Sequence, residues 1–321
     1  MKEDRRSPSV SDKTFSLLMR VGVMVLAIGV AAFGFMYYQD QHVDAGPSLL
    51  GRQTLAAETA VKKAPNNIAA RLVLADSYRQ DKRYDDELAQ YTEILKADKA
   101  NRFALLGRGA ALTAKGDLRA AAISYHKIAD VEQKGEFAGA DPQLEEARYY
   151  LGSIALKQGK NKEAITWLTA ALKIDKSDSD ALYLMGVAQY KEGSNLEALG
   201  SLQQALRFVP TGWCEPYSQL ALVYGKLGSP LQVTYAGAMA DFCHKKPAEA
   251  TTRLKTLLKS PMAVDAMLGL ALIEETGSNN PEAASWYKKV LVVDRKNATA
   301  TAALTRLGTG STGTSTTQGP S

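Results

Sequence analysis

The sequence predicts an all-α fold, a right-handed α-solenoid of helical hairpins that follows one N-terminal transmembrane helix. Three observations predict it. A helix-turn-helix pattern returns 34 residues later (Leu151 to Met185), the turns carry glycine, and a long uncharged apolar run lies near the N-terminus. One hairpin cannot bury both of its apolar faces, so hairpins of this kind stack on their neighbours.

The clearest repeat spans residues 145–178. Its two halves carry aliphatic and small residues at helical spacing on either side of Gly159. Glycine ends the first helix and the polar residues after it begin the second. The next copy keeps the register: Leu151-Gly152 returns as Met185-Gly186, Gly159 as Gly193, Ala164 as Ala198, Leu168 as Leu202 and Ala171-Leu172 as Ala205-Leu206.

This register, with a Leu-Gly pair, a glycine turn, an alanine and Pro210 at the close, resembles the tetratricopeptide repeat (TPR) family. The small residues have a physical reason, because only Gly or Ala lets the two helices approach closely where they cross. The resemblance implies protein or peptide partners bound on the concave face. Its architecture is similar to single-span TPR subunits that serve bacterial envelope assembly.

The solenoid is expected over residues 48–308, with about six repeats. Ser48 can cap a leading helix that ends near Lys63. Gly116 and Gly159 lie 43 residues apart, nine more than one period, so residues 131–142 are predicted to be an insertion. A contact role and a tolerated insertion both remain open. The expected elements are repeats at 68–101, 102–130, 145–178, 179–212 and 214–243, a helix at 247–259, a helix pair at 262–294 and a terminal helix at 297–307.

Residues 15–38 are predicted to form the transmembrane helix. No charge interrupts the run from Val21 to Tyr38, and about 20 apolar residues span a bilayer. A cleaved signal peptide and a buried soluble helix are the alternatives; bulky aromatic residues stand where a signal peptidase would cut. Residues 1–14 are predicted to be a disordered cytoplasmic tail, 39–47 a linker and 309–321 a disordered Gly/Ser/Thr tail.

The flanking charges predict orientation. Residues 1–20 carry five basic side chains and residues 39–58 carry one, Arg52. Since basic flanks stay in the cytoplasm, we expect a single-pass protein of the cytoplasmic (inner) membrane with an extracytoplasmic solenoid.

Composition argues against several classes of function. A net charge of +5 over 321 residues is too small to indicate a nucleic-acid binder. No phosphate loop, catalytic serine motif or zinc motif is present, so we expect no enzyme, no cofactor, no metal and no small-molecule substrate. The acidic groups 85–87 and 145–146 fall at predicted helix starts, where they complement the helix dipole. A metal site built from Cys214, Cys243 and His244 is a remote alternative.

Cys214 and Cys243 lie fifteen and fourteen residues from Ser229, on either side of the same predicted turn. In two antiparallel helices both would lie at the same open end, and small residues between them let the helices close up. A disulfide needs Cα atoms within about 7 Å and an oxidising compartment. A disulfide and two buried free thiols stay equally open.

The resemblance also implies which first-helix positions line the partner-binding groove. Tyrosine there offers apolar area with a polar tip, which suits a peptide site. Packing of the same tyrosines against the next helix is the equal alternative. The groove residues are Phe103, Leu106, Tyr149, Ser153, Lys157, Tyr183, Val187, Tyr190 and Lys191.

Two functions compete. The first is a membrane-anchored extracytoplasmic scaffold that binds protein partners through its groove in an envelope assembly or secretion complex. The second is a chaperone-like binder of unfolded secreted polypeptides. An enzyme is the third class, which the missing reaction centre argues against.

Overall fold

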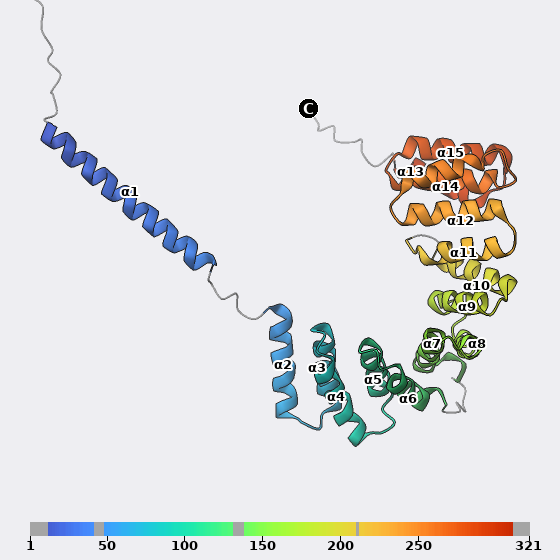
Figure 1. Ribbon diagram of the computed structural model, residues 1–321, viewed down its shortest axis with the longest axis horizontal. Helices are drawn as coiled ribbons and strands as arrows, with labels where there is room; N and C mark the ends of the chain where they lie inside the picture. Colours follow the sequence, from blue (N-terminus) through green and yellow to red (C-terminus); the bar gives the residue numbers. More distant parts are fainter. Residues whose placement is uncertain (1–11, 42–47, 131–137, 210–211, 311–321) are drawn as a thin grey trace, which may run out of the picture. The chain divides into compact units, whose positions relative to one another are not determined.

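The computed structural model describes residues 12–41, 48–130, 138–209 and 212–310. Every regular element in these ranges is helical, which confirms the all-α class. The chain divides into two compact units, Met1–Pro65 and Asn66–Ser321. Figure 1 shows the helices in sequence colours.

The first unit contains α1 (Asp12–Gln41) and α2 (Leu49–Lys63). The Ser48 hydroxyl accepts a hydrogen bond from the Gly51 amide at 3.0 Å, so Ser48 caps α2 as predicted. Residues 24–38 of α1 are exposed. The predicted tail residues 1–11 and the linker residues 42–47 lie outside the described residues.

Among the residues that the structure describes, no helix has an apolar stretch long enough to cross a membrane.

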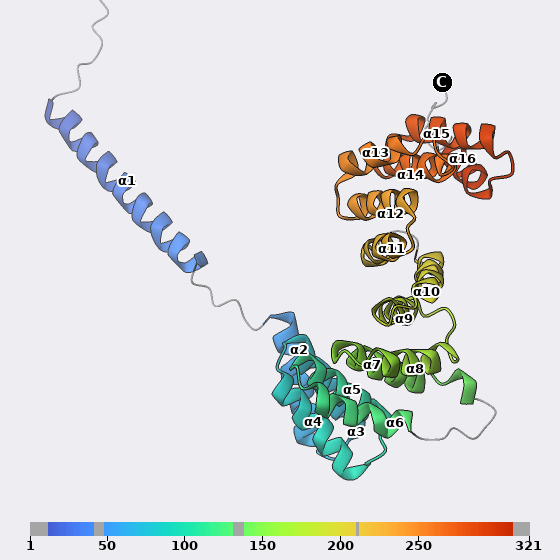
Figure 2. The same ribbon diagram turned by 45° about the vertical axis from the view of Figure 1, so that its right-hand side comes forward.

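The second unit is a series of helices in which each contacts the next along the chain. The pairs follow one another in sequence order in both views (Figures 1 and 2). The helices are α3 (Ile68–Gln80), α4 (Tyr84–Ala97), α5 (Arg102–Ala114), α6 (Leu118–Ala129), α7 (Pro142–Lys157), α8 (Asn161–Leu172), α9 (Ser179–Lys191), α10 (Asn195–Phe208), α11 (Glu215–Lys226), α12 (Pro230–Cys243), α13 (Pro247–Thr256), α14 (Ala263–Thr276), α15 (Asn280–Val293) and α16 (Ala298–Gly310).

Each hairpin turn contains one residue in the left-handed conformation. Gly116, Gly159, Gly193 and Gly228 hold positive φ angles at four of them. Three other turns use a residue with a side chain at the same place: Lys82 (φ 58°), Lys245 (φ 62°) and Ser278 (φ 63°). The amide after the left-handed residue bonds back into the helix, as Lys160 N does to the Ala155 carbonyl at 2.9 Å. Glycine therefore marks most of these turns in the sequence and misses three.

The helices of a hairpin cross closely at glycine. A Cβ added at Gly152 would lie 2.6 Å from the Leu168 Cγ, and one at Gly186 would lie 2.7 Å from the Leu202 Cγ. Such distances are well inside van der Waals contact, so a side chain at either position would force the leucine or the helix to shift. The Leu-Gly register of the repeat is thus a packing requirement.

The C-terminal part adds a contact to the predicted pairing. α12 packs against α11, as the second helix of the predicted fifth repeat, and to a similar extent against α13. The turn between α12 and α13 contains the left-handed Lys245, as the other hairpin turns do. α12 is therefore shared between two hairpins, and α14 with α15 forms the next pair. The sequence missed this because a lysine stands where glycine marks the other turns.

The structure describes only the last residues of the predicted insertion, 138–142. Residues 131–137 lie outside the described part, and a 3-10 turn, Ala138–Ala140, leads into α7. α7 begins at Pro142, three residues before the predicted start, because Asp141 caps it through the Leu144 amide at 3.1 Å. Asp141 also pairs with Arg102 at 2.6 Å, which ties this helix start to α5. At the other end α16 continues to Gly310, and the tail residues 311–321 are not described.

Candidate protein-binding face

One face of the second unit is built from the first helices of successive hairpins. α7 contacts α5 and α9 directly, and α9 contacts α11. Across it, the charge of Arg79 on α3 acts on Glu146 and Tyr150 of α7. Helices that approach each other on one side make a stack curve toward that side, so this surface is the concave one. We call the surface of α3, α5, α7, α9 and α11 the first-helix face.

The predicted groove residues differ in how much surface they offer. Phe103 is 65% exposed. Lys157 and Lys191 are exposed and Ser153 is half-buried. Leu106 is different: it is only 9% exposed and belongs to the core around Tyr125. Leu106 therefore serves packing and gives a partner almost no surface.

The predicted groove tyrosines are half-buried and contact the neighbouring repeat. Tyr149 packs against the core formed by Leu168 and Met185. Tyr183 and Tyr190 pack against the core around Leu202. Each of these side chains therefore both packs against its neighbours and keeps part of its surface exposed, so packing alone does not describe them.

Aromatic contacts continue beyond the predicted residues. Tyr150 stacks on Tyr125, with ring centroids 4.9 Å apart, and meets Tyr149 edge-on at 5.2 Å. Trp213, just before α11, meets Tyr183 edge-on at 5.2 Å. Sequence reasoning missed Tyr150 and Trp213; the adjacent Tyr149-Tyr150 pair and a tryptophan beside a helix start were the available signals. These contacts hold the aromatic rings of the face in fixed orientations.

Val187, also predicted for the groove, is half-buried beside the core that contains Leu156. The face therefore combines apolar and aromatic area with the exposed cations Lys157 and Lys191.

A group of carboxylates lies at the start of α7 and α9. Burial, the hydrogen bond to Asp178 and the charge of Asp178 together raise the pKa of Glu145 to about 8. Asp178 caps α9 by accepting from the Asp180 and Ala181 amides at 3.0 and 3.1 Å. Burial, followed by the charges of Asp180 and Asp178, raises the pKa of Tyr149 to about 12. At neutral pH the Glu145 carboxyl is therefore mostly protonated, and this end of the face holds acid groups whose negative charge is reduced by burial and by their neighbours.

Glu87 lies in the first turn of α4, at a helix start as predicted, yet its side chain is 0% exposed. In the other hairpins its place in the register is taken by Ala121, Ala164 and Ala198, each also 0% exposed. That register was the signal that could have located Glu87 in the core.

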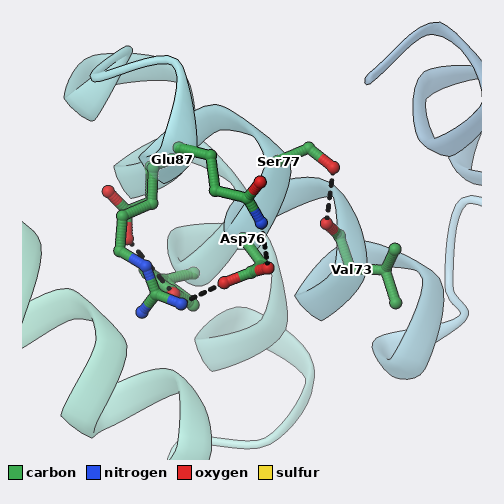
Figure 3. Close-up of polar contacts among 7 residues, drawn as sticks. Val73, Asp76, Ser77 and Glu87 are labelled. Atoms are coloured by element: carbon green, nitrogen blue, oxygen red, sulfur yellow. Dashed lines mark hydrogen bonds and ion pairs between the residues drawn. The ribbon is translucent and has the colours of Figure 1, made fainter. Parts of the chain in front are cut away.

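The contacts of Glu87 are few. One carboxylate oxygen accepts from the Tyr91 hydroxyl at 3.3 Å, and its Oε2 has no hydrogen-bond partner within the described part. Burial raises the pKa of Glu87, and the nearby Arg79 opposes that rise. Figure 3 shows Glu87 at the junction of α3 and α4 with Asp76, which pairs with Arg79. The first hairpin thus carries a buried acid beside a charged pair on the first-helix face.

Cys214 and Cys243 are joined as a disulfide, with Cα atoms 5.3 Å apart. It links the start of α11 to the end of α12, the same open end that the sequence indicated. Among the described residues no group of histidine, cysteine and acidic side chains is placed to hold a metal ion.

Comparison with known families supports the tetratricopeptide class. A TPR repeat profile matches residues 152–193, and a tetratricopeptide repeat profile matches residues 54–102 and 235–300. The second match begins within α12, in agreement with the shared role of that helix. No curated protein matches the sequence.

Solved structures show the same fold. Pseudomonas aeruginosa pilF aligns with a TM-score of 0.52 and 14% identity, over 70% of this chain and 95% of its own. The C-terminal part of a TPR repeat-containing protein from Cytophaga hutchinsonii aligns with a TM-score of 0.50 and 17% identity, over 79% of this chain and 94% of its own. At these identities the similarity establishes a TPR fold and nothing of function.

Proposed function

We propose that the protein is a membrane-anchored, extracytoplasmic TPR scaffold that binds protein partners through its first-helix face in an envelope assembly or secretion complex. The observation that carries the binding role is the first-helix face itself, where Phe103 is 65% exposed and Tyr149, Tyr183 and Tyr190 keep part of their surface open. Aromatic side chains with fixed rotamers bury much apolar area at low entropic cost. The proposal includes no reaction.

The anchor rests on the sequence of residues 15–38 and on its helical state. These 24 residues lie within α1, and at 1.5 Å per residue they extend about 36 Å, against a hydrocarbon core of about 30 Å. The apolar stretch among the described side chains, residues 24–38, is by itself too short to cross it, so the length rests on the sequence of the whole segment. The described side chains 24–38 are exposed and mostly apolar. An exposed apolar helix is stable in lipid and costly in water, which favours the membrane.

The anchor can be tested by extraction. We expect the full chain to stay in the membrane pellet in alkaline carbonate and to dissolve in detergent. Added protease should digest the solenoid in spheroplasts, where the outer face of the membrane is accessible. Release of the intact chain by carbonate would contradict the anchor, and protection of the solenoid would contradict its orientation.

The binding role can be tested by crosslinking in native membranes, followed by purification and mass spectrometry. One or two stoichiometric partners support the scaffold, whereas a broad set of secreted chains supports the chaperone-like alternative. Charge reversal of Lys157 and Lys191 on the face should reduce the crosslinks. Reversal of Lys162, exposed on α8, is the matched control and should leave them unchanged. Equal loss in both variants, or no crosslinks, would contradict the role of the face.

A further inference from the structure

A cavity opens beside the disulfide, where α12 and α14 end. Its volume is about 590 Å³, within the range of about 300–1,000 Å³ that small-ligand and anchor sites occupy. Its lining is mainly apolar, from Phe242, Pro247, Leu272 and Ile273. Phe242 and Ile273 also belong to the core around Leu254, so the floor of this cavity is part of the packed interior.

The cavity is fixed in place by its surroundings. Cys243 lines it and is bonded to Cys214, which ties the end of α12 to the start of α11. Lys245 follows in the left-handed conformation, and the Lys246 amide bonds back to the Asp241 carbonyl at 2.9 Å. A turn held in this way keeps the cavity open without a partner, which lowers the entropic cost of binding.

Among the described residues, Lys245 is the one charged side chain that lines the cavity, and no acidic side chain lines it. Lys245 lines the cavity, His244 and Lys246 beside it are exposed, and within the described part no carboxylate forms a salt bridge with any of the three.

Two of the acids near the cavity in sequence are already engaged, and the exposed Glu249 does not line it. Asp241 pairs with Arg253 at 2.7 Å. Glu275 accepts from the Tyr287 hydroxyl at 2.9 Å and pairs with Arg306 at 2.6 Å. An apolar cavity with a cationic rim therefore complements an apolar group that has a negative charge next to it.

We propose that this cavity is a second binding site, separate from the first-helix face, for a polypeptide segment that carries one large apolar side chain beside a carboxylate. The apolar side chain enters between Phe242 and Leu272, and the carboxylate meets the ammonium group of Lys245. The site needs no contribution from α3 to α10, so it stands or falls independently of partner binding on the first-helix face.

The test uses the full chain in detergent and two fluorescent synthetic peptides. One carries a phenylalanine beside an aspartate, and the other has asparagine in place of the aspartate. Fluorescence anisotropy should show the aspartate peptide binding about fivefold more tightly, because an ion pair at a partly exposed site contributes on the order of 1 kcal/mol. The difference should shrink as salt is raised.

Lys245→Gly is the decisive variant, since φ of 62° at this position suits glycine and the substitution removes only the charged side chain. It should abolish the preference for aspartate. Lys82→Gly is its matched control: Lys82 holds φ of 58° at the equivalent turn between α3 and α4, and this variant should bind both peptides as the wild type does.

Three results would overturn the proposal. They are no binding of either peptide, equal binding of both by the wild type, and loss of preference in Lys82→Gly as well as in Lys245→Gly. A third variant separates the two sites. If Tyr183→Ala removes peptide binding, the peptide occupies the first-helix face and the second site is excluded.

Discussion

The buried carboxylate of Glu87 gives a quantitative test of the packing, through the substitution Glu87→Gln. Glutamine has nearly the same shape and keeps an oxygen for the Tyr91 hydroxyl, which now lies 3.3 Å from the carboxylate. It removes a negative charge from a side chain that is 0% exposed and whose Oε2 has no partner in the described part. The change therefore isolates the cost of burying the charge.

The expected gain in stability of Glu87→Gln follows from the desolvation cost of the buried charge. An unpartnered buried polar group costs about 1–3 kcal/mol, and a charged one costs more. The amide of the variant is also unpartnered, so only the charged part of the cost is recovered, about 1 kcal/mol. Arg79 attracts the carboxylate and reduces the gain further.

The pKa shift of Glu87 determines how the stability difference between wild type and variant changes with pH. Because burial raises the pKa of Glu87 above 4.5, the folded protein holds a proton there that the unfolded chain releases. The stability that this proton provides is complete below about pH 4.5 and is lost as pH rises through the folded pKa. Glutamine cannot titrate, so the variant should equal the wild type at low pH and exceed it at pH 8.

Urea unfolding of both proteins at pH 4.5 and pH 8 measures this difference. Asp85→Asn is the control on the same helix; Asp85 is exposed, pairs with Lys115 and lies in the first turn of α4, so its substitution should be slightly destabilising at both pH values. A Glu87→Gln variant that is less stable at pH 8, or a difference that does not change with pH, would refute the reasoning.

Three further predictions follow from the same packing. In Glu145→Gln the free energy of unfolding should lose the part of its pH dependence that lies between 4.5 and about 8, because the wild type loses a stabilising proton from Glu145 as pH rises through this range. Unfolding curves of variant and wild type at a series of pH values measure this. A free energy of unfolding that changes with pH in the same way in both proteins would contradict it. Gly152→Ala should destabilise by about 1–3 kcal/mol because its Cβ would lie 2.6 Å from a leucine Cγ of α8, whereas Gly200→Ala, with nothing within 4 Å, should stabilise by up to about 1 kcal/mol; thermal melts that rank these two in the opposite order would be inconsistent with the close crossing. Replacing Cys214 and Cys243 with serine should cost about 3–4 kcal/mol locally for a separation of 29 residues; hydrogen exchange of α11 and α12 measures this, and intact mass without reductant should find no free thiol in the native protein.

Much of the fold could be predicted from the sequence because its signals are local and repeated. The glycines Gly152 and Gly186 at close crossings, each facing a leucine of the partner helix, act within one hairpin, and the register then repeats. The same locality allowed both cysteines to be placed at one end of α11 and α12.

The features that the sequence did not indicate depend on contacts that a repeat pattern does not contain. Glu87 was interpreted by its chemistry, as an acid at a helix start, although its register position put it where other hairpins bury alanine. The shared role of α12 depends on Lys245 adopting a glycine-like conformation, which residue type alone does not indicate. Leu106 followed the family's groove position but is drawn into the core around Tyr125.

Site-specific photocrosslinking in the native membrane tests most directly whether partners bind to the first-helix face. A photoreactive side chain at Phe103 on the first-helix face is compared with one at Leu196 on α10, where the two native side chains are 65% and 71% exposed. We predict discrete crosslinked partner bands from position 103 and none from position 196. Equal bands from both positions, or bands from position 196 alone, would contradict partner binding by the first-helix face.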